Sequence, residues 1–426
     1  MPALRKSLFF LIVFFLSFQV GLHFWPEFAK VSGIRIDYLS PILYLLDILI
    51  IAWIILGGVR WTRENTRIRS RINPFLKVSI LLFGLDLLTN FFLARSPGAH
   101  IFGIVKLVEF GLFGWLVAKT FEKKDISVFV RVLALSAIVS SLLAIWQFIK
   151  QSSVGGLWYF LGEREFNIST IGISTVNLDQ QILRPYAAFP HPNVLAFFLL
   201  ATIVFAFMRL PHEKKLTKIF LIISILISSV VLILTLSRIA ILVAIGFLFY
   251  VIYANVKMRR IVLGVFGMLG LFGIFILSRI ITSDFLLRGI DFRQELLAQS
   301  FQIFLNNPYF GIGLNNFFAH QLDLIKNISP ILFQPPHNVF VIALLSLGVF
   351  GWWIFPGLLF AAVKNLLRSM KGIRGDGGIR DFYTAVLLIL FAIVVVGMFD
   401  HFFLTLEQGQ IILSLILGLS FVKFKS

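Results

Sequence analysis

The feature that most constrains this chain is a series of apolar runs, each long enough to cross a lipid bilayer. A transmembrane helix needs about 20 apolar residues, and twelve such runs alternate with charged or Pro- and Gly-rich breaks. A water-soluble fold of 426 residues could not hide 49 phenylalanines. We therefore expect an all-α, polytopic membrane helical bundle. The predicted spans are 7–25, 38–57, 73–93, 99–118, 127–149, 190–208, 217–236, 239–254, 260–281, 337–362, 382–399 and 404–422.

Basic residues predict the orientation of this bundle. They concentrate in alternate connections and near both chain ends, and Lys and Arg in short loops stay in the cytoplasm. We therefore expect cytoplasmic N- and C-termini and a single integral membrane domain, 1–426, in the cytoplasmic (inner) membrane. The segments 150–189 and 282–336 are long and poor in Lys and Arg, so they are predicted as outer loops. Apolar residues at helical spacing in 292–304 predict an amphipathic helix along the outer interface.

The charge balance and the absence of cysteine exclude several function classes. The formal net charge of +18 is mostly accounted for by the cytoplasmic connections, so no nucleic-acid partner is expected. Without cysteine the chain has no disulfide, thiolate nucleophile or iron–sulfur cluster. We expect membrane lipid as a partner, no cofactor and no metal.

His337 is the first candidate for chemistry. It follows Gln334–Pro335–Pro336 and precedes Asn338 and an apolar run, so a rigid segment delivers an imidazole to the outer end of a helix. Such a histidine can carry a proton near neutral pH. The alternative is a side chain that only caps the helix or bonds a carbonyl.

Three arginines are predicted on the same outer side. Arg238 lies at a tight turn within an apolar stretch, Arg293 lies on the amphipathic helix, and Arg184 precedes the sixth span. Intramembrane cations tend to be functional, and guanidinium groups match phosphate oxygens. The alternatives are a local ion pair of Arg293 with Asp291 or Glu295, and an Arg238 side chain that reaches lipid headgroups.

Four elements between residues 180 and 410 carry a family resemblance. They are Arg184–Pro185–Tyr186 with His191–Pro192–Asn193, Ser237–Arg238, Arg293 with Asn307–Pro308–Tyr309–Phe310–Gly311–Ile312–Gly313, and Pro336–His337–Asn338 with Gly348 and Gly351. In order and spacing, over residues 180–410, they resemble the O-antigen ligase and O-antigen polymerase family, membrane glycosyltransferases of the GT-C class.

The resemblance implies transfer of a glycan from an undecaprenyl-diphosphate carrier to an acceptor hydroxyl of a glycan, lipid or protein. The reaction would occur on the outer face of the cytoplasmic membrane, without metal and with inversion. By the motif matches, Arg238, Arg293 and Arg184 would bind the donor diphosphate, with Arg238 and Arg293 stabilising its developing charge. His337 would orient or deprotonate the acceptor hydroxyl, and Asn338 would support it. Within the family, a lipopolysaccharide ligase and a polysaccharide polymerase both remain open.

Further polar residues could support this site. Asp400 and His401, with Thr405 and Glu407 after them, are predicted at the last outer turn and could line the same cavity. His191 and Asn193 begin the sixth span, where helix capping is the alternative role.

Four ionisable residues lie at membrane depth in the second to fourth predicted spans, namely Asp47, Asp86, Lys106 and Glu109. They predict either a proton path or a buried ion-pair network holding helices together.

Two other classes of function fit a twelve-span bundle. A transporter or flippase for a lipid-linked saccharide would also place arginines in a cavity, but the chain lacks the repeated halves typical of alternating access. A structural subunit without activity would tolerate replacement of Arg238, Arg293 and His337.

Overall fold

The computed structural model describes residues 2–64, 74–178, 180–254, 284–324, 333–373 and 375–424, and these are mostly helical. Helices satisfy backbone hydrogen bonds internally, as an apolar environment requires. The helices are α1 (Pro2–Phe15), α2 (Leu45–Glu64), α3 (Pro74–Leu93), α4 (Pro97–Thr120), α5 (Asp125–Lys150), α6 (Leu157–Phe160), α7 (Pro192–Arg209), α8 (Lys215–Leu234), α9 (Arg238–Ala254), α11 (Asp284–Asn306), α12 (Phe317–Gln321), α13 (Val339–Gly351), α14 (Ile354–Gly372), α15 (Gly377–Gly397), α16 (Phe402–Thr405) and α17 (Glu407–Ser420).

Short antiparallel hairpins interrupt the helical fold, which the all-α prediction did not include. They are β1 (Gly21–His23) with β4 (Ile42–Tyr44), β2 (Lys30–Val31) with β3 (Ile34–Arg35), and β5 (Thr175–Leu178) with β6 (Gln180–Leu183). Three short 3-10 helices accompany them, namely η1 (Glu27–Ala29), η2 (Asp37–Leu39) and η3 (Leu210–His212).

Two predicted spans are wrong at their boundaries because of the β1–β4 hairpin. The helix predicted over 7–25 ends at Phe15, and the one predicted over 38–57 begins only at Leu45. Between them, Gly21 pairs with Tyr44 and His23 with Ile42. A short apolar run fits a paired strand as well as a helix, so hydrophobicity alone could not place these boundaries.

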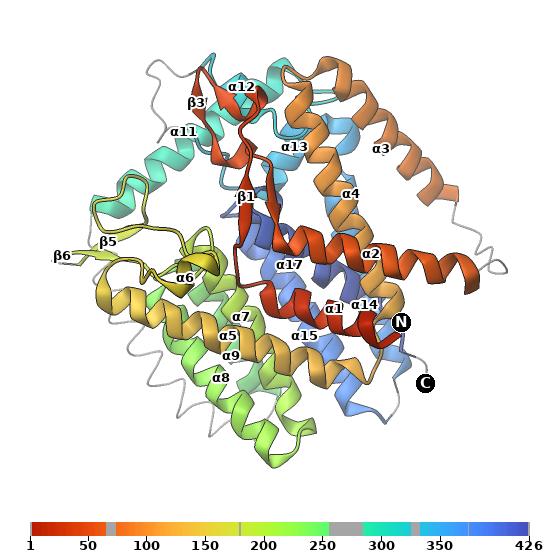
Figure 1. Cartoon of the computed structure of the whole chain (residues 1–426). Helices are drawn as coiled ribbons and strands as arrows, with labels where there is room; N and C mark the ends of the chain where they lie inside the picture. Colours follow the sequence, from red (N-terminus) through yellow and green to blue (C-terminus); the bar gives the residue numbers. More distant parts are fainter. Residues whose placement is uncertain are drawn as a thin grey trace.

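The core is organised around α7. Almost every side chain of this helix is buried, and α5, α8, α9 and α15 pack against it. Figure 1 shows α5, α7, α8 and α9 gathered in one half of the molecule, with α11 and α12 at the opposite end. A helix that is apolar on all sides is stable only when other helices or lipid surround it. The buried position of α7 therefore fixes the helix starts and turns that carry the candidate site.

Among the described residues, five helices are long and apolar enough to cross a membrane, or six if α13 and α14 form one broken span. The five are α4, α5, α7, α8 and α15. Shorter apolar helices lie at Leu45–Leu56, Leu81–Leu93 and Arg238–Tyr253, within the predicted spans 38–57, 73–93 and 239–254. The predicted span 260–281 lies outside the described residues.

The predicted span 337–362 is broken in the structure, because α13 and α14 are bent by 100° relative to each other. Gly348 has φ 58°, and a Cβ there would lie 2.2 Å from the carbonyl oxygen of Tyr309. Backbone hydrogen bonds join the motif loop to this bend: Ile312 N donates to Leu345 O (2.8 Å) and Val349 N to Pro308 O (2.9 Å). The Asn–Pro–x–x–Gly–x–Gly element thus packs against the bend, where only glycine permits the close approach.

Both chain ends lie at one end of the bundle (Figure 1). Lys6 Nζ lies 2.6 Å from Asp125 Oδ1 at the start of α5, and the Phe424 ring contacts Phe121 between α4 and α5. Lys123 in the same turn pairs with Asp376, which caps α15. Because α15 runs from this end, its last residues and the following Asp400 lie at the opposite end, where the candidate site forms.

Candidate functional site

The site begins with two histidines that come from the ends of different helices. His337 precedes α13 and His401 follows α15, and their rings meet edge to face with centroids 5.0 Å apart. Asn338 caps α13, accepting hydrogen bonds from Phe340 N (2.9 Å) and Val341 N (3.1 Å). The Asn338 amide also donates to Met398 O (3.1 Å) at the end of α15. Asn338 therefore holds the two helix ends, and with them the two imidazoles, together.

Asp400 is the buried centre of this arrangement. Its carboxylate accepts hydrogen bonds from Asn193 Nδ2 (2.6 Å) and from the backbone N of His401 (2.7 Å). Burial raises the pKa of Asp400, but the surrounding polar groups, among them the hydrogen bond from Asn193, outweigh burial and leave the pKa below its usual value. Asp400 is therefore an anion among the histidines.

Arg184 ties three separate segments to this centre. Its Nε donates to Thr235 O (2.6 Å), one Nη to Ser174 Oγ (2.8 Å) and the other to Asn193 Oδ1 (2.7 Å). These bonds connect the residue before β5, the first turn of α7 and the α8–α9 turn. The predicted donor-binding arginine is thus engaged in fixing the frame, and through Thr235 it holds the turn that presents Arg238.

Arg238 and Arg293 share the electrostatic environment of Arg184. Burial lowers the pKa of Arg184 to about 10, and the positive charges of Arg238 and Arg293 contribute in the same direction. The charge of Arg293 also lowers the pKa of His337 and the pKa of His401. The structure thus brings the three predicted arginines and His337 into one electrostatic region. The alternative partner Asp291 lies in the part of α11 whose side chains fall outside the described residues.

Burial keeps the histidines of the site neutral. It lowers the pKa of His337 to about 3, helped by His401 and Arg293 and opposed by Asp400. Burial and Arg184 likewise lower the pKa of His191 to about 3. His191 caps α7, where its Nδ1 accepts a hydrogen bond from Asn193 N (3.1 Å). His337 Nδ1 is buried and has no hydrogen-bond partner among the described residues.

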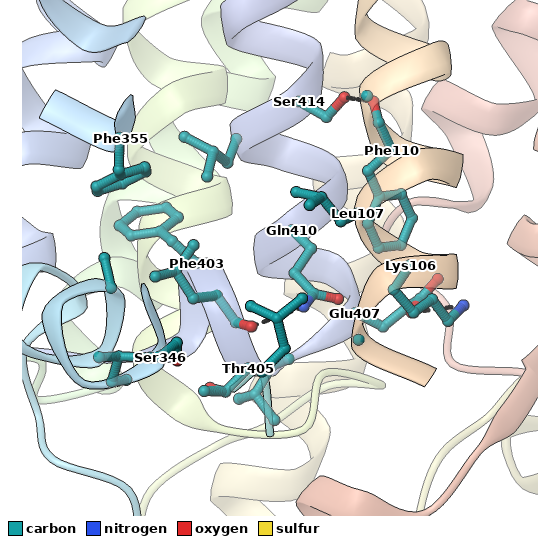
Figure 2. Close-up of a pocket in the computed structure, with 18 of the residues that line it drawn as sticks. Lys106, Leu107, Phe110, Ser346, Phe355, Phe403, Thr405, Glu407, Gln410 and Ser414 are labelled. Atoms are coloured by element: carbon teal, nitrogen blue, oxygen red, sulfur yellow. Dashed lines mark hydrogen bonds and ion pairs between the residues drawn. The ribbon is translucent and has the colours of Figure 1, made fainter. Parts of the chain in front are cut away.

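A cavity of about 1040 Å³ adjoins the histidines. Tyr38 and Thr405 line it and both contact His401: the Tyr38 ring lies edge-on at 5.5 Å, and Thr405 Oγ1 lies 2.6 Å from His401 Nδ1. Figure 2 shows Gln410 and Glu407 beside Lys106 on one side of the cavity, with Phe355 and Phe403 on the other. The sequence had suggested Thr405 and Glu407 as cavity residues. Tyr38 was missed because it stands within a run predicted as the start of a span.

Lys106 is the hub of a buried ion network beside this cavity. Its Nζ lies 2.6 Å from Asp47 Oδ1, 3.2 Å from Glu407 Oε2 and 3.3 Å from Glu109 Oε2. The network joins α2, α4 and α17. It agrees with one of the two alternatives given by the sequence, a buried ion-pair network that holds helices together. Glu407 takes the place that the sequence suggested for Asp86.

Asp86 lies apart from the Lys106 network. Its carboxylate accepts a hydrogen bond from Asn90 Nδ2 (3.3 Å) within α3 and faces Gly351 of α13. In the described part of the chain, no group of three or more histidine, aspartate or glutamate side chains is placed to hold a metal ion.

The substitution Lys106→Met is expected to lower the free energy of unfolding by about 3–5 kcal/mol, because it leaves buried carboxylates without their cation. Denaturant unfolding of the reconstituted protein, followed by tryptophan fluorescence, measures this loss. Lys30→Met is the control, since Lys30 pairs with exposed Glu27 and should change stability by less than about 1 kcal/mol. Equal effects of the two substitutions would contradict a stabilising network.

Part of the sequence matches a known protein family. Residues 222–355 match the family model described as O-Antigen ligase. This segment, about a third of the chain, is similar to O-antigen ligases. The match confirms the predicted resemblance, and with the apolar helices it indicates an integral membrane protein with a role in glycan transfer or polymerisation. No curated protein matches the chain.

The O-antigen ligase match covers only part of the site. Arg238, Arg293 and His337 lie within residues 222–355. Other groups lie outside it: Arg184 with Ser174 and Asn193, Asp400 with His401, and the cavity wall on α4 and α17. The candidate site is therefore assembled from the matched segment and from elements before and after it.

Proposed function

We propose that this chain is a membrane glycosyltransferase that moves a glycan from an undecaprenyl-diphosphate carrier to an acceptor hydroxyl. The observation that carries the proposal is that the charges of Arg238 and Arg293 both act on Arg184, and that Arg293 also acts on neutral His337. Asp400 can offset only one of these three charges, and a diphosphate supplies further matching charge. Family membership supports lipid-linked glycan and acceptor substrates in general.

The proposed reaction is a single displacement at the anomeric carbon of the donor. The acceptor hydroxyl oxygen forms a bond to this carbon as the bond to the diphosphate oxygen breaks, which inverts the configuration. The hydroxyl proton passes to His337, and undecaprenyl diphosphate leaves with the bonding electron pair. Arg238 and Arg293 stabilise the charge that develops on the leaving group. No step needs a metal or an enzyme nucleophile.

The proposed membrane topology has twelve spans, cytoplasmic termini and a site on the outer face. Two observations support it: the termini meet at the basic α4–α5 turn, and the site residues stand at the helix ends farthest from that turn. In this topology the amphipathic helix α11 lies at the outer interface within the outer loop 282–336, and 150–189 forms the second outer loop.

A reconstituted transfer assay tests the proposal. The full chain in lipid nanodiscs would receive an undecaprenyl-diphosphate-linked glycan together with candidate acceptors. Released undecaprenyl diphosphate and glycosylated acceptor would be measured by mass spectrometry. We expect one released carrier for each glycan transferred, unchanged by a chelator of divalent metals. Absence of release with every class of acceptor, or loss of activity on chelation, would overturn the proposal.

The pH profile of the same assay tests the state of His337. Because burial lowers the pKa of His337 to about 3, its neutral form persists as pH falls. An ordinary imidazole, with pKa about 6.5, would be about nine-tenths protonated at pH 5.5. We therefore expect kcat/KM to stay within about twofold between pH 8 and 5.5. A tenfold acid-side loss centred near pH 6.5 would contradict a buried, neutral base.

A further inference from the structure

His401 is held by two contacts with a single side chain, that of Thr405. Thr405 Oγ1 lies 2.6 Å from His401 Nδ1 and 3.1 Å from the backbone O of the same histidine. A carbonyl oxygen can only accept a hydrogen bond, so the Thr405 hydroxyl donates its hydrogen to that oxygen. Because a hydroxyl has one hydrogen, Thr405 Oγ1 must then accept from His401 Nδ1. Nδ1 of His401 therefore carries the ring hydrogen.

This tautomer leaves the other ring nitrogen of His401, Nε2, with a free lone pair. A neutral imidazole has one N–H and one acceptor nitrogen, and burial keeps His401 neutral by lowering its pKa. Among the described residues, the hydrogen bonds of the ring are made through Nδ1. The hydrogen bond of one ring nitrogen sets which nitrogen is free to act. Nε2 is thus the nitrogen of His401 that can accept a proton.

The two imidazoles of the site differ in what holds them. His337 Nδ1 is buried without a hydrogen-bond partner among the described residues. His401, in contrast, is tied to Thr405 through Nδ1 and to Asp400 through its backbone N (2.7 Å). Asn193 holds Asp400 in turn (2.6 Å). A histidine base works best when one neighbour fixes its orientation and an anion stabilises its protonated form. His401 meets both conditions.

The charges around the two histidines favour a proton on His401. Burial lowers the pKa of His401, Asp400 opposes this effect, and Arg293 acts with burial. Burial and the charge of a protonated His401 lower the pKa of His337 to about 3, with Asp400 opposing and Arg293 adding to the shift. A proton that reaches His337 is therefore more stable on the neighbouring ring. The ring centroids are 5.0 Å apart, near enough for a proton to pass directly or through one water.

We propose that His401 is a second proton acceptor of the site and that Thr405 is the residue that positions it. The acceptor hydroxyl gives its proton to His337 as it attacks the anomeric carbon. The proton then passes from His337 to Nε2 of His401, which restores neutral His337 and leaves an imidazolium beside anionic Asp400. It returns to solvent when the products leave. This assignment rests on the proposed glycosyl transfer and adds two residues outside the matched segment 222–355.

The tautomer of His401 can be measured without relying on activity. The full chain, with isotopically labelled histidine nitrogens, would be placed in nanodiscs and studied by solid-state NMR. The Nδ1–H and Nε2–H tautomers give different pairs of nitrogen chemical shifts. His401→Gln identifies the signals of His401 among those of the seven histidines. We expect the Nδ1–H tautomer in the wild type, and the Nε2–H tautomer there would overturn the proposal.

Substitutions of Thr405 test its positioning role. Thr405→Val keeps the shape of the side chain but loses the hydroxyl. We expect kcat to fall about tenfold, as for the loss of one hydrogen bond, and the His401 signals to show both tautomers. Thr405→Ser keeps the hydroxyl and should restore both. Thr202→Val is the control, because buried Thr202 makes the same kind of bond to Phe198 O (2.9 Å) within α7. An unchanged tautomer and kcat in Thr405→Val would overturn the positioning role.

A double substitution tests whether the two histidines act on the same proton. We expect His401→Ala to lower kcat by about 10²-fold. The His337→Ala, His401→Ala double variant should be no slower than His337→Ala alone, because His401 has no proton to receive once His337 is gone. Additive losses would place His401 in another step and overturn the relay alone. A wild-type chain that releases no undecaprenyl diphosphate with any acceptor would overturn the proposed function itself.

Discussion

Replacement of His337 by alanine is expected to lower glycan transfer by about 10²- to 10⁴-fold, the range that a positioned acid or base contributes. The ring is held edge-on to His401, and its Nδ1 is buried without a partner among the described residues. Loss of the imidazole removes the group that would accept the hydroxyl proton. The rate of release of undecaprenyl diphosphate measures the effect.

His212→Ala is the matched control for this experiment. His212 bonds Asp381 (2.8 Å) at the helix ends near the chain termini, away from the candidate site. Its loss should leave transfer within about twofold, as expected for a surface substitution. Full activity of the His337→Ala protein, with a normal melting temperature, would remove His337 from the mechanism.

Substitution of Arg238 or Arg293 by glutamine is expected to reduce kcat by about 10²-fold each, similar to the loss of one group that stabilises a transition-state anion. The charges of Arg238 and Arg293 both lower the pKa of Arg184. Lysine at either position should retain part of the rate, because it keeps the charge but loses the forked geometry. Steady-state kinetics with varied donor concentration separate kcat from the KM of the donor.

Arg95→Gln serves as the control for the arginine series. Arg95 is exposed and pairs with Asp323 (2.5 Å) before α4. We expect its replacement to leave donor kinetics unchanged. A loss in this variant as large as in Arg238→Gln would point to a general effect of surface charge, and would count against a specific diphosphate site.

The sequence indicated individual candidate residues but not the frame that holds them. His337 and Arg238 stood out because polar groups in apolar surroundings are costly and rarely incidental. The bonds of Arg184 to Thr235 O and Asn193 could not be foreseen. These bonds join segments that are distant in sequence, and a local sequence pattern does not indicate such contacts.

Errors in the predicted fold have a common physical origin. The apolar run after Phe15 satisfies its backbone by pairing with Ile42–Tyr44, and hydropathy does not distinguish such a strand from a helix. The break at Gly348 likewise depends on the backbone of Tyr309, far away in the chain. Glu407 replaces Asp86 beside Lys106 for the same reason. Helix existence follows from local composition, but bends and polar pairs depend on tertiary contacts.

The hydrogen bond between Asn193 and Asp400 spans 207 positions of the chain. Closing so long a loop is entropically costly, so such a contact forms after local structure. During synthesis, the ribosome must release the final helices before this bond can exist. A nascent chain that already contains Arg184, Arg238 and Arg293 would still lack Asp400 and His401, which complete the candidate site. The candidate site is therefore complete only after the last helices have been synthesised.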